Sequence, residues 1–229
     1  MKKTLFLLLT FILLIILTGC MFRYSFKGAD RDADNAAPLS TILKPDDVLY
    51  YDSVEEAVAH NTLETYDVKH VDEQIKLFQH DNLAVLFFKS NINNKDIIYV
   101  LKLYTKEESP KTLFSSPISG TNIFWEAYKT AVEKNKCDKL GEIRLCIELF
   151  NSTKSFNADS AKNFIWGLSQ TEEVKKLKIE GQTVTQVIAI EMDGETGYFW
   201  YFGDLVTDKP LVFADIRKYN EGEIVITMS

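Results

Sequence analysis

An apolar run at the start of the chain limits which residues can form the folded protein. Lys2 and Lys3 precede the run Leu5–Leu17, which only Thr10 interrupts. A short positive segment followed by such a run is typical of a secretory signal peptide, and the run is shorter than the roughly 20 residues that cross a bilayer as a helix. We therefore expect the fold to be built from the residues after this run, outside the cytoplasm.

The run ends in Leu17-Thr18-Gly19-Cys20, which resembles the lipobox of bacterial lipoproteins. The resemblance implies that a diacylglyceryl group is joined to the Cys20 thiol by a thioether bond and that cleavage follows between Gly19 and Cys20. Residues 1–19 would then be a lipoprotein signal peptide. Two acyl chains such as palmitate, at roughly 0.8 kcal/mol per buried methylene, would hold the mature chain on the extracytoplasmic face of the cell membrane.

Net charge narrows the range of partners. The chain carries a net charge of −7, and loss of Lys2 and Lys3 with the signal peptide would leave about −9. An acidic chain lacks the basic surface that contacts with phosphates need, so we expect no nucleic-acid partner. Anionic lipid would also repel it, which leaves the lipidated Cys20 as the membrane contact.

The chain is expected to form an α+β fold, mainly antiparallel sheet with few helices, as one domain or two packed subdomains. Polar, Asp-rich residues up to about 45 predict a flexible tether over 20–45. An N-terminal α+β half is predicted over 46–106 and a C-terminal α+β half over 118–229. The Glu-rich and Pro-containing residues 107–117 mark the seam between the halves.

Local signals predict the elements of the N-terminal half. A short strand is expected at 48–51, followed by a helix to about Asn61 that a capping box of Ser53 and Glu56 would open. Three runs with strand character then form a predicted antiparallel meander, separated by turn-rich breaks at 80–82 and 91–95. These runs span 74–79, 83–89 and 96–104.

Several elements are also predicted in the C-terminal half. Apolar residues at helical spacing predict a helix that Thr121 or Asn122 would cap and that would end near Asn135. Apolar and polar residues alternate over 143–149, which predicts a half-buried strand. Strands are also expected at 211–214 and 223–228. A hairpin over 183–192 and 197–202 would turn at Asp193-Gly194.

Cys137 and Cys146 are the only cysteines after Cys20. If Gly141-Glu142 forms a two-residue hairpin turn, the two cysteines face each other at a non-hydrogen-bonded pair, where the α-carbons are close enough for a disulfide. Such a bridge would contribute roughly 2.7 kcal/mol in the chain-entropy model. Two unbridged thiols are the alternative, because export permits a disulfide without requiring one.

Residues 162–168 could begin a helix or form a strand. The segment from Trp166 to Phe202 is similar, in its pattern of aromatic, apolar and glycine residues, to a pattern in small uncharacterised lipoproteins of Gram-positive bacteria. The similarity covers about 40 residues. It favours a strand over 162–168 and implies no catalytic residue.

Five aromatic residues occur in succession at Tyr198-Phe199-Trp200-Tyr201-Phe202. In a strand, Tyr198, Trp200 and Phe202 share one face. One interpretation is a central strand covered on both sides. The other makes these three side chains an exposed surface for a glycan or a protein, because aromatic faces offer large apolar contact at little cost in side-chain entropy.

No catalytic motif is apparent. The sequence has no Gly-x-Ser-x-Gly, His-Glu-x-x-His, Ser-x-x-Lys or glycine-rich phosphate loop. His60, His70 and His80 match no compact zinc motif, so we expect no metal site and no cofactor. The sequence therefore predicts a non-enzymatic binding or accessory module of the cell envelope, with an envelope protein or glycan as partner. An envelope-acting enzyme without a recognisable motif is the alternative.

Overall fold

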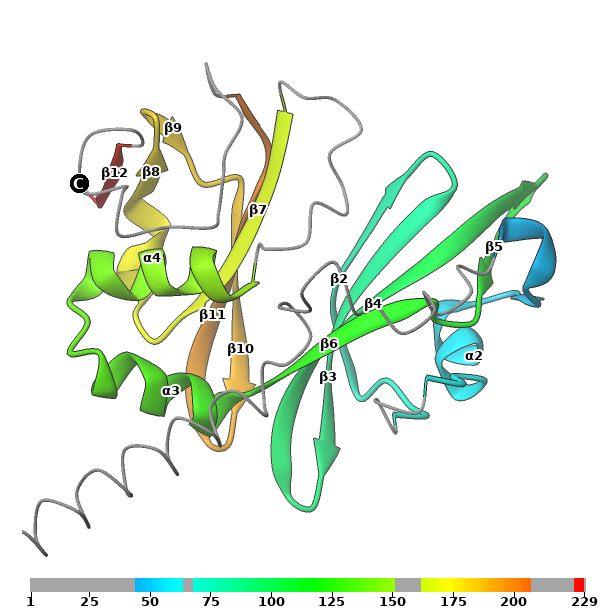
Figure 1. Cartoon of the computed structure of the whole chain (residues 1–229), viewed down its shortest axis with the longest axis horizontal. Helices are drawn as coiled ribbons and strands as arrows, with labels where there is room; N and C mark the ends of the chain where they lie inside the picture. Colours follow the sequence, from blue (N-terminus) through cyan, green and yellow to red (C-terminus); the bar gives the residue numbers. More distant parts are fainter. Residues whose placement is uncertain (1–43, 64–67, 151–161, 207–224, 229) are drawn as a thin grey trace, which may run out of the picture. The chain divides into compact units, whose positions relative to one another are not determined.

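The computed structural model describes residues 44–63, 68–150, 162–206 and 225–228. Three α-helices accompany antiparallel sheets in these residues, which confirms the predicted α+β class (Figure 1). The predicted signal peptide, Cys20, most of the tether and the strand at 211–214 lie outside the described residues. Among the described residues, no helix combines the length and the apolarity that a membrane crossing requires.

The first sheet has the strand order β1-β5-β4-β3-β2, with β6 also paired to β4. Its strands are β1 (Tyr50–Tyr51), β2 (Glu73–His80), β3 (Leu83–Ile92), β4 (Lys95–Glu108), β5 (Lys111–Ser115) and β6 (Ser119–Phe124). The predicted strand at 48–51 and the meander are thus confirmed, with longer strands. β5 and β6 lie one after the other along the same side of β4. β4 is long enough to pair with both of them.

The short helix α2 (Val54–Ala59) begins as the capping box predicts. The Ser53 hydroxyl accepts a hydrogen bond from the Glu56 amide at 3.1 Å, and the Glu56 carboxylate accepts one from the Asp52 amide at 3.3 Å. These bonds satisfy amides that have no partner within the helix. Val54, Ala57 and Val58 face the sheet and are buried, so α2 covers one face of β3 and β4.

The second sheet contains the predicted aromatic strand and its hairpin. Its order is β10-β11-β7, formed by β10 (Gln186–Met192), β11 (Glu195–Val206) and β7 (Lys162–Ser169). Asp193 and Gly194 both have positive φ, 51° and 81°, as the predicted two-residue turn requires. Residues 162–168 are therefore a strand.

A third, small sheet of order β12-β8-β9 completes the described part. It contains β8 (Leu177–Ile179), β9 (Gln182–Thr183) and β12 (Ile226–Met228). Single 3₁₀ turns, η1 (Pro45–Asp47) and η2 (Glu172–Lys176), precede β1 and β8. β12 lies within the predicted strand at 223–228.

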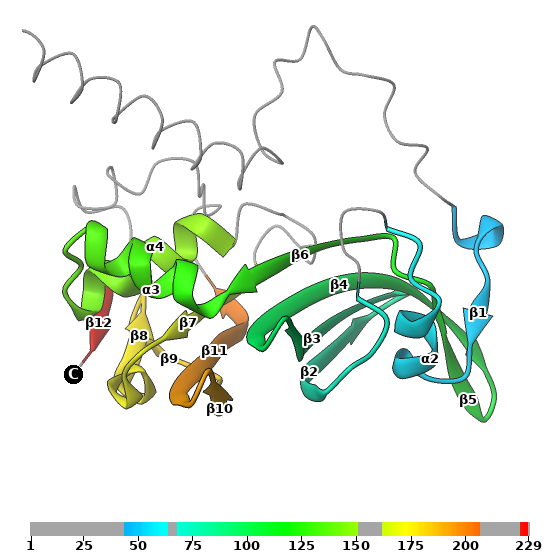
Figure 2. The same cartoon turned by 90° about the horizontal axis from the view of Figure 1, so that it is seen from below.

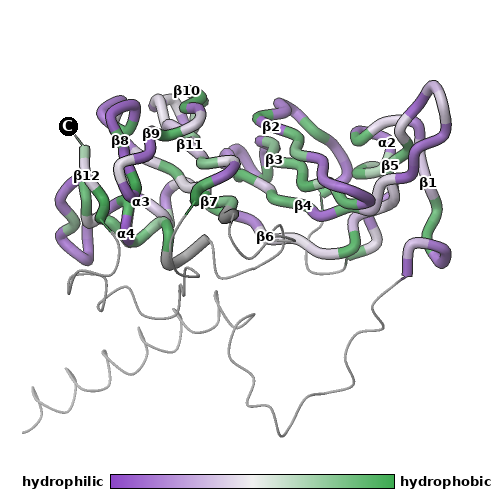
Figure 3. Tube along the Cα trace, turned by 90° about the horizontal axis from the view of Figure 1, so that it is seen from above, coloured by the Kyte–Doolittle hydropathy of each residue, from purple (hydrophilic) through white to green (hydrophobic). Residues whose placement is uncertain are grey.

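The first two sheets pack face to face through aromatic side chains. Phe87 of β3 lies 4.9 Å from Trp166 of β7 and 5.0 Å from Phe199 of β11, measured between ring centroids. Neighbouring residues of β3 point to the opposite face, where Leu86 and Phe88 join the core under α2. In Figure 3, hydrophobic and hydrophilic residues are interspersed along the strands of both sheets.

Two hairpin turns join the sheets at one end. The Asp96 amide donates to the Asp193 carboxylate at 2.9 Å, and the Asp193 amide donates to the Asp96 carboxylate at 2.8 Å. Beside them, Lys89 Nζ donates to the carbonyl oxygen of Glu191 at 2.9 Å. We name this contact the turn-to-turn tie; it fixes the β3-β4 hairpin against the β10-β11 hairpin.

The residues predicted as a seam, 107–117, do not separate the sheets. Glu107 and Glu108 pair with Thr112 and Lys111 across the β4-β5 hairpin, and β6 then returns to pair with β4. The Pro-containing segment is thus a hairpin turn within the first sheet. That sheet ends at Phe124, where Figure 2 shows β6 leading directly into helix α3.

Helix α3 (Trp125–Lys134) ends beside Asn135 as predicted, but its start differs. Thr121 and Asn122, the predicted caps, lie in β6, and Phe124 occupies the N-cap position without a side-chain hydrogen bond. The reason is pairing: residues 119–124 all find partners on β4, so the chain stays extended to Phe124.

Helix α4 (Lys139–Phe150) replaces the predicted hairpin and strand, both of which are wrong. Asp138 begins the helix, since its carboxylate accepts a hydrogen bond from the Gly141 amide at 2.7 Å. Ile143, Cys146 and Ile147 are buried at the spacing of one helix face. Alternating apolar residues fit this face as well as a strand, and the packing against β7 favours the helix.

Candidate functional site

The aromatic strand is a covered central strand, so the proposed exposed surface of Tyr198, Trp200 and Phe202 is wrong. Trp200 and Phe202 are 0% and 2% exposed, and Tyr198 is half-buried. β11 has β10 on one side and β7 on the other. One face packs on the first sheet and the other lies under α4, which leaves no row of rings for a ligand.

Cys137 and Cys146 are both free, which agrees with the alternative of two unbridged thiols and not with the possible disulfide. Cys137 lies before α4 and Cys146 lies two helical turns along it, so they do not face each other across a hairpin. Cys146 points into the core, where its thiol donates to the carbonyl oxygen of Leu168 at 2.9 Å.

The three histidines do not converge. His60 stacks on Tyr51, and His80 lies 3.1 Å from Asp81 at a turn. In the part of the chain that the structure describes, no three His, Cys, Asp or Glu side chains are grouped as metal ligands would be.

His70 contacts both Ser90 and Asp72, a set of residues that invites comparison with a catalytic triad. Its Nε2 atom lies 3.1 Å from the Ser90 hydroxyl and 3.4 Å from the Asp72 carboxylate. A triad needs the serine and the carboxylate on opposite ring nitrogens, whereas here both contact the same nitrogen. Ser90 is also fully buried, so the contact satisfies a buried hydroxyl and exposes no nucleophile.

Buried polar side chains do gather at one place, along the free edge of strand β7. We name this group the β7-edge cluster; it consists of Tyr128 of α3, Glu142 and Cys146 of α4, Ser169 of β7 and Trp200 of β11. Helices α3 and α4 lie beside the second sheet in Figure 1 and bring these residues to its edge.

One half of the cluster surrounds the carbonyl oxygen of Leu168. The Trp200 indole donates to this oxygen at 3.1 Å and the Cys146 thiol donates at 2.9 Å. The Tyr128 hydroxyl oxygen lies 3.0 Å from it, and the single hydrogen of that hydroxyl is shared between this oxygen and the Glu142 carboxylate. No further strand extends the sheet beyond β7 among the described residues. The side chains therefore supply the hydrogen bonds that a neighbouring strand would make.

Glu142 supplies a hydrogen-bond acceptor for the next backbone amide on this edge, that of Gln170. Its carboxylate accepts from the Gln170 amide at 2.8 Å, the Tyr128 hydroxyl at 2.7 Å and the Ser169 hydroxyl at 3.3 Å. Hydrogen bonds to an ionised carboxylate are stronger than those between neutral groups. The carboxylate is thus buried with partners on both oxygens, which offsets its desolvation cost.

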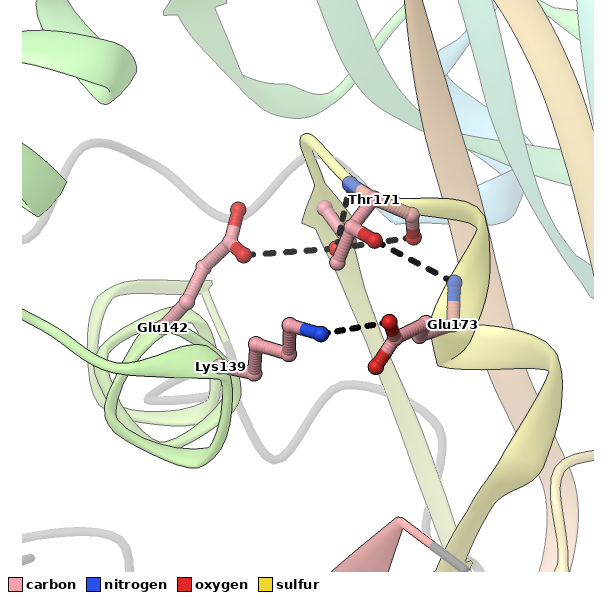
Figure 4. A network of polar contacts seen from close by, with 5 residues as sticks. Lys139, Glu142, Thr171 and Glu173 are labelled. Atoms are coloured by element: carbon pink, nitrogen blue, oxygen red, sulfur yellow. Dashed lines mark hydrogen bonds and ion pairs between the residues drawn. The ribbon is translucent and has the colours of Figure 1, made fainter.

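Figure 4 shows Glu142 and Lys139 of α4 directed at the segment that follows β7. Lys139 pairs with the Glu173 carboxylate, and this hydrogen bond lowers the pKa of Glu173. Thr171 caps η2 by accepting from the Glu173 amide at 3.3 Å. The helix is therefore fixed to this segment by an exposed ion pair as well as by the buried carboxylate.

Gly167 makes the cluster sterically feasible. A Cβ atom at this position would lie 2.4 Å from Cζ2 of Trp200 and 3.0 Å from Cβ of Cys146. Because residue 167 has no Cβ atom, the Trp200 ring can lie across β7. Its indole nitrogen then reaches the Leu168 carbonyl oxygen at the far edge of the strand. The requirement for glycine here comes from the close approach of α4 and Trp200.

The cluster is not suited to nucleophilic chemistry. Burial raises the pKa of the Cys146 thiol to about 12 and also raises the pKa of the Tyr128 hydroxyl. Both groups are protonated at neutral pH, and a thiol is a poor nucleophile compared with a thiolate. What the arrangement does is satisfy the backbone of an edge strand.

Sequence reasoning missed this cluster because Gly141-Glu142 was predicted as a turn. The available signal was Glu142 four residues before Cys146, which places the carboxyl and the thiol on one helix face. Asp138 as an N-cap three residues before Gly141 was a second signal. Neither predicts that Leu168 and Gln170 would be the partners.

Comparison with known proteins adds no assignment. No family model, curated protein or solved structure matches this chain.

Proposed function

We propose that this chain is a lipid-anchored, extracytoplasmic lipoprotein that acts as a non-enzymatic binding or accessory module of the cell envelope. The observation that carries the proposal is Leu17-Thr18-Gly19-Cys20 at the end of the apolar run Leu5–Leu17. Thr18 and Gly19 are small enough to enter a peptidase site, and the Cys20 thiol is the atom that can be alkylated.

The described residues favour binding over catalysis. The Cys146 thiol, whose pKa is raised to about 12, is buried, and the Ser90 hydroxyl beside His70 is buried too. Reactive groups of enzymes are accessible to a substrate and have pKa values matched to their task. An envelope protein or glycan remains the proposed partner class, contacted through the exterior of the sheets.

The Cys20→Ala variant tests the anchor. We expect it to lose the acyl chains and to leave the membrane fraction that is resistant to high salt, because the proposed anchor is removed and anionic lipid repels an acidic chain. Cys137→Ser is the matched control, since it removes a thiol that the proposal does not use and should stay in the membrane. Retention of Cys20→Ala in the salt-resistant membrane fraction, at the level of Cys137→Ser, would contradict the proposal.

A further inference from the structure

We draw no further inference here: the strongest candidate, the half-buried surface patch that Lys102 and Tyr104 of β4 form with Leu113 of β5 on one face of the first sheet, carries nothing, because the neighbouring Lys106 already pairs with Glu108 at 2.6 Å and nothing in the described part of the chain shows what covers the patch.

Discussion

At the residue scale, a glycine that permits close approach says more about how the core is packed than the exposed charges do. Gly167 allows the Trp200 ring to cross β7 and reach the Leu168 carbonyl oxygen. The need for a glycine there is invisible in the sequence, because it depends on an indole from β11 and a thiol from α4. The five successive aromatic residues were visible, but whether they were covered depended on elements elsewhere in the chain.

Gly167→Ala should lower the free energy of unfolding by about 1–3 kcal/mol, since the added methyl group must displace the Trp200 ring or α4. Gly203→Ala is the matched control on β11, where a Cβ atom would meet only Cε2 of Tyr201 at 3.9 Å. Urea unfolding of the two variants measures the difference. Equal stabilities would show that α4 can move away without cost.

At the element scale, local patterns predicted most of the described strands and the turn at Asp193-Gly194, but they predicted a turn and a strand where helix α4 lies. The hairpin turn at Asp193-Gly194 and the cap at Ser53 are determined by a few neighbouring residues, and both are confirmed. The alternation over 143–149 fits a strand and a helix equally, and packing against β7 decides for α4. Thr121 and Asn122 stay in β6 for a similar reason, since pairing with β4 outweighs their capping preference.

The turn-to-turn tie should make stability depend on pH. Burial raises the pKa of Asp96, but hydrogen bonds from the Asp193 amide and the Asn91 side chain, with Lys89 nearby, leave it lowered from 3.8. A carboxyl whose pKa is lower in the folded state than in the unfolded state stabilises the folded protein at pH values above its unfolded-state pKa. That contribution is lost as the pH falls from about 4 through the lower folded value.

Asp96→Asn should therefore destabilise the protein at pH 7 by about 1 kcal/mol, because one acceptor of the tie becomes a donor. The deficit relative to the wild type should shrink as the pH falls from about 4 toward pH 3, because the stabilisation that comes from the lowered pKa of Asp96 decreases over this range. Asp47→Asn, at an exposed position in η1, is the control and should have little effect at either pH. A deficit that stays constant between pH 7 and pH 3, measured by urea unfolding, would contradict this assignment.

At the scale of the whole molecule, the proposed lipidation signal precedes a folded part in which, among the described residues, one sheet edge is capped by side chains and another is left uncapped. The sequence alone predicted the α+β class, the meander and the aromatic hairpin. It did not predict the β7-edge cluster or the free edge of β6, because each depends on which strands become neighbours.

We propose that Cys20 is the lipidated first residue of the mature chain. The most direct measurement is the mass of the N-terminal peptide from protein extracted from membranes. We expect a peptide that begins at Cys20 and carries a diacylglyceryl group on the thiol. A peptide that begins at Met1, or a Cys20 with an unmodified thiol, would contradict it.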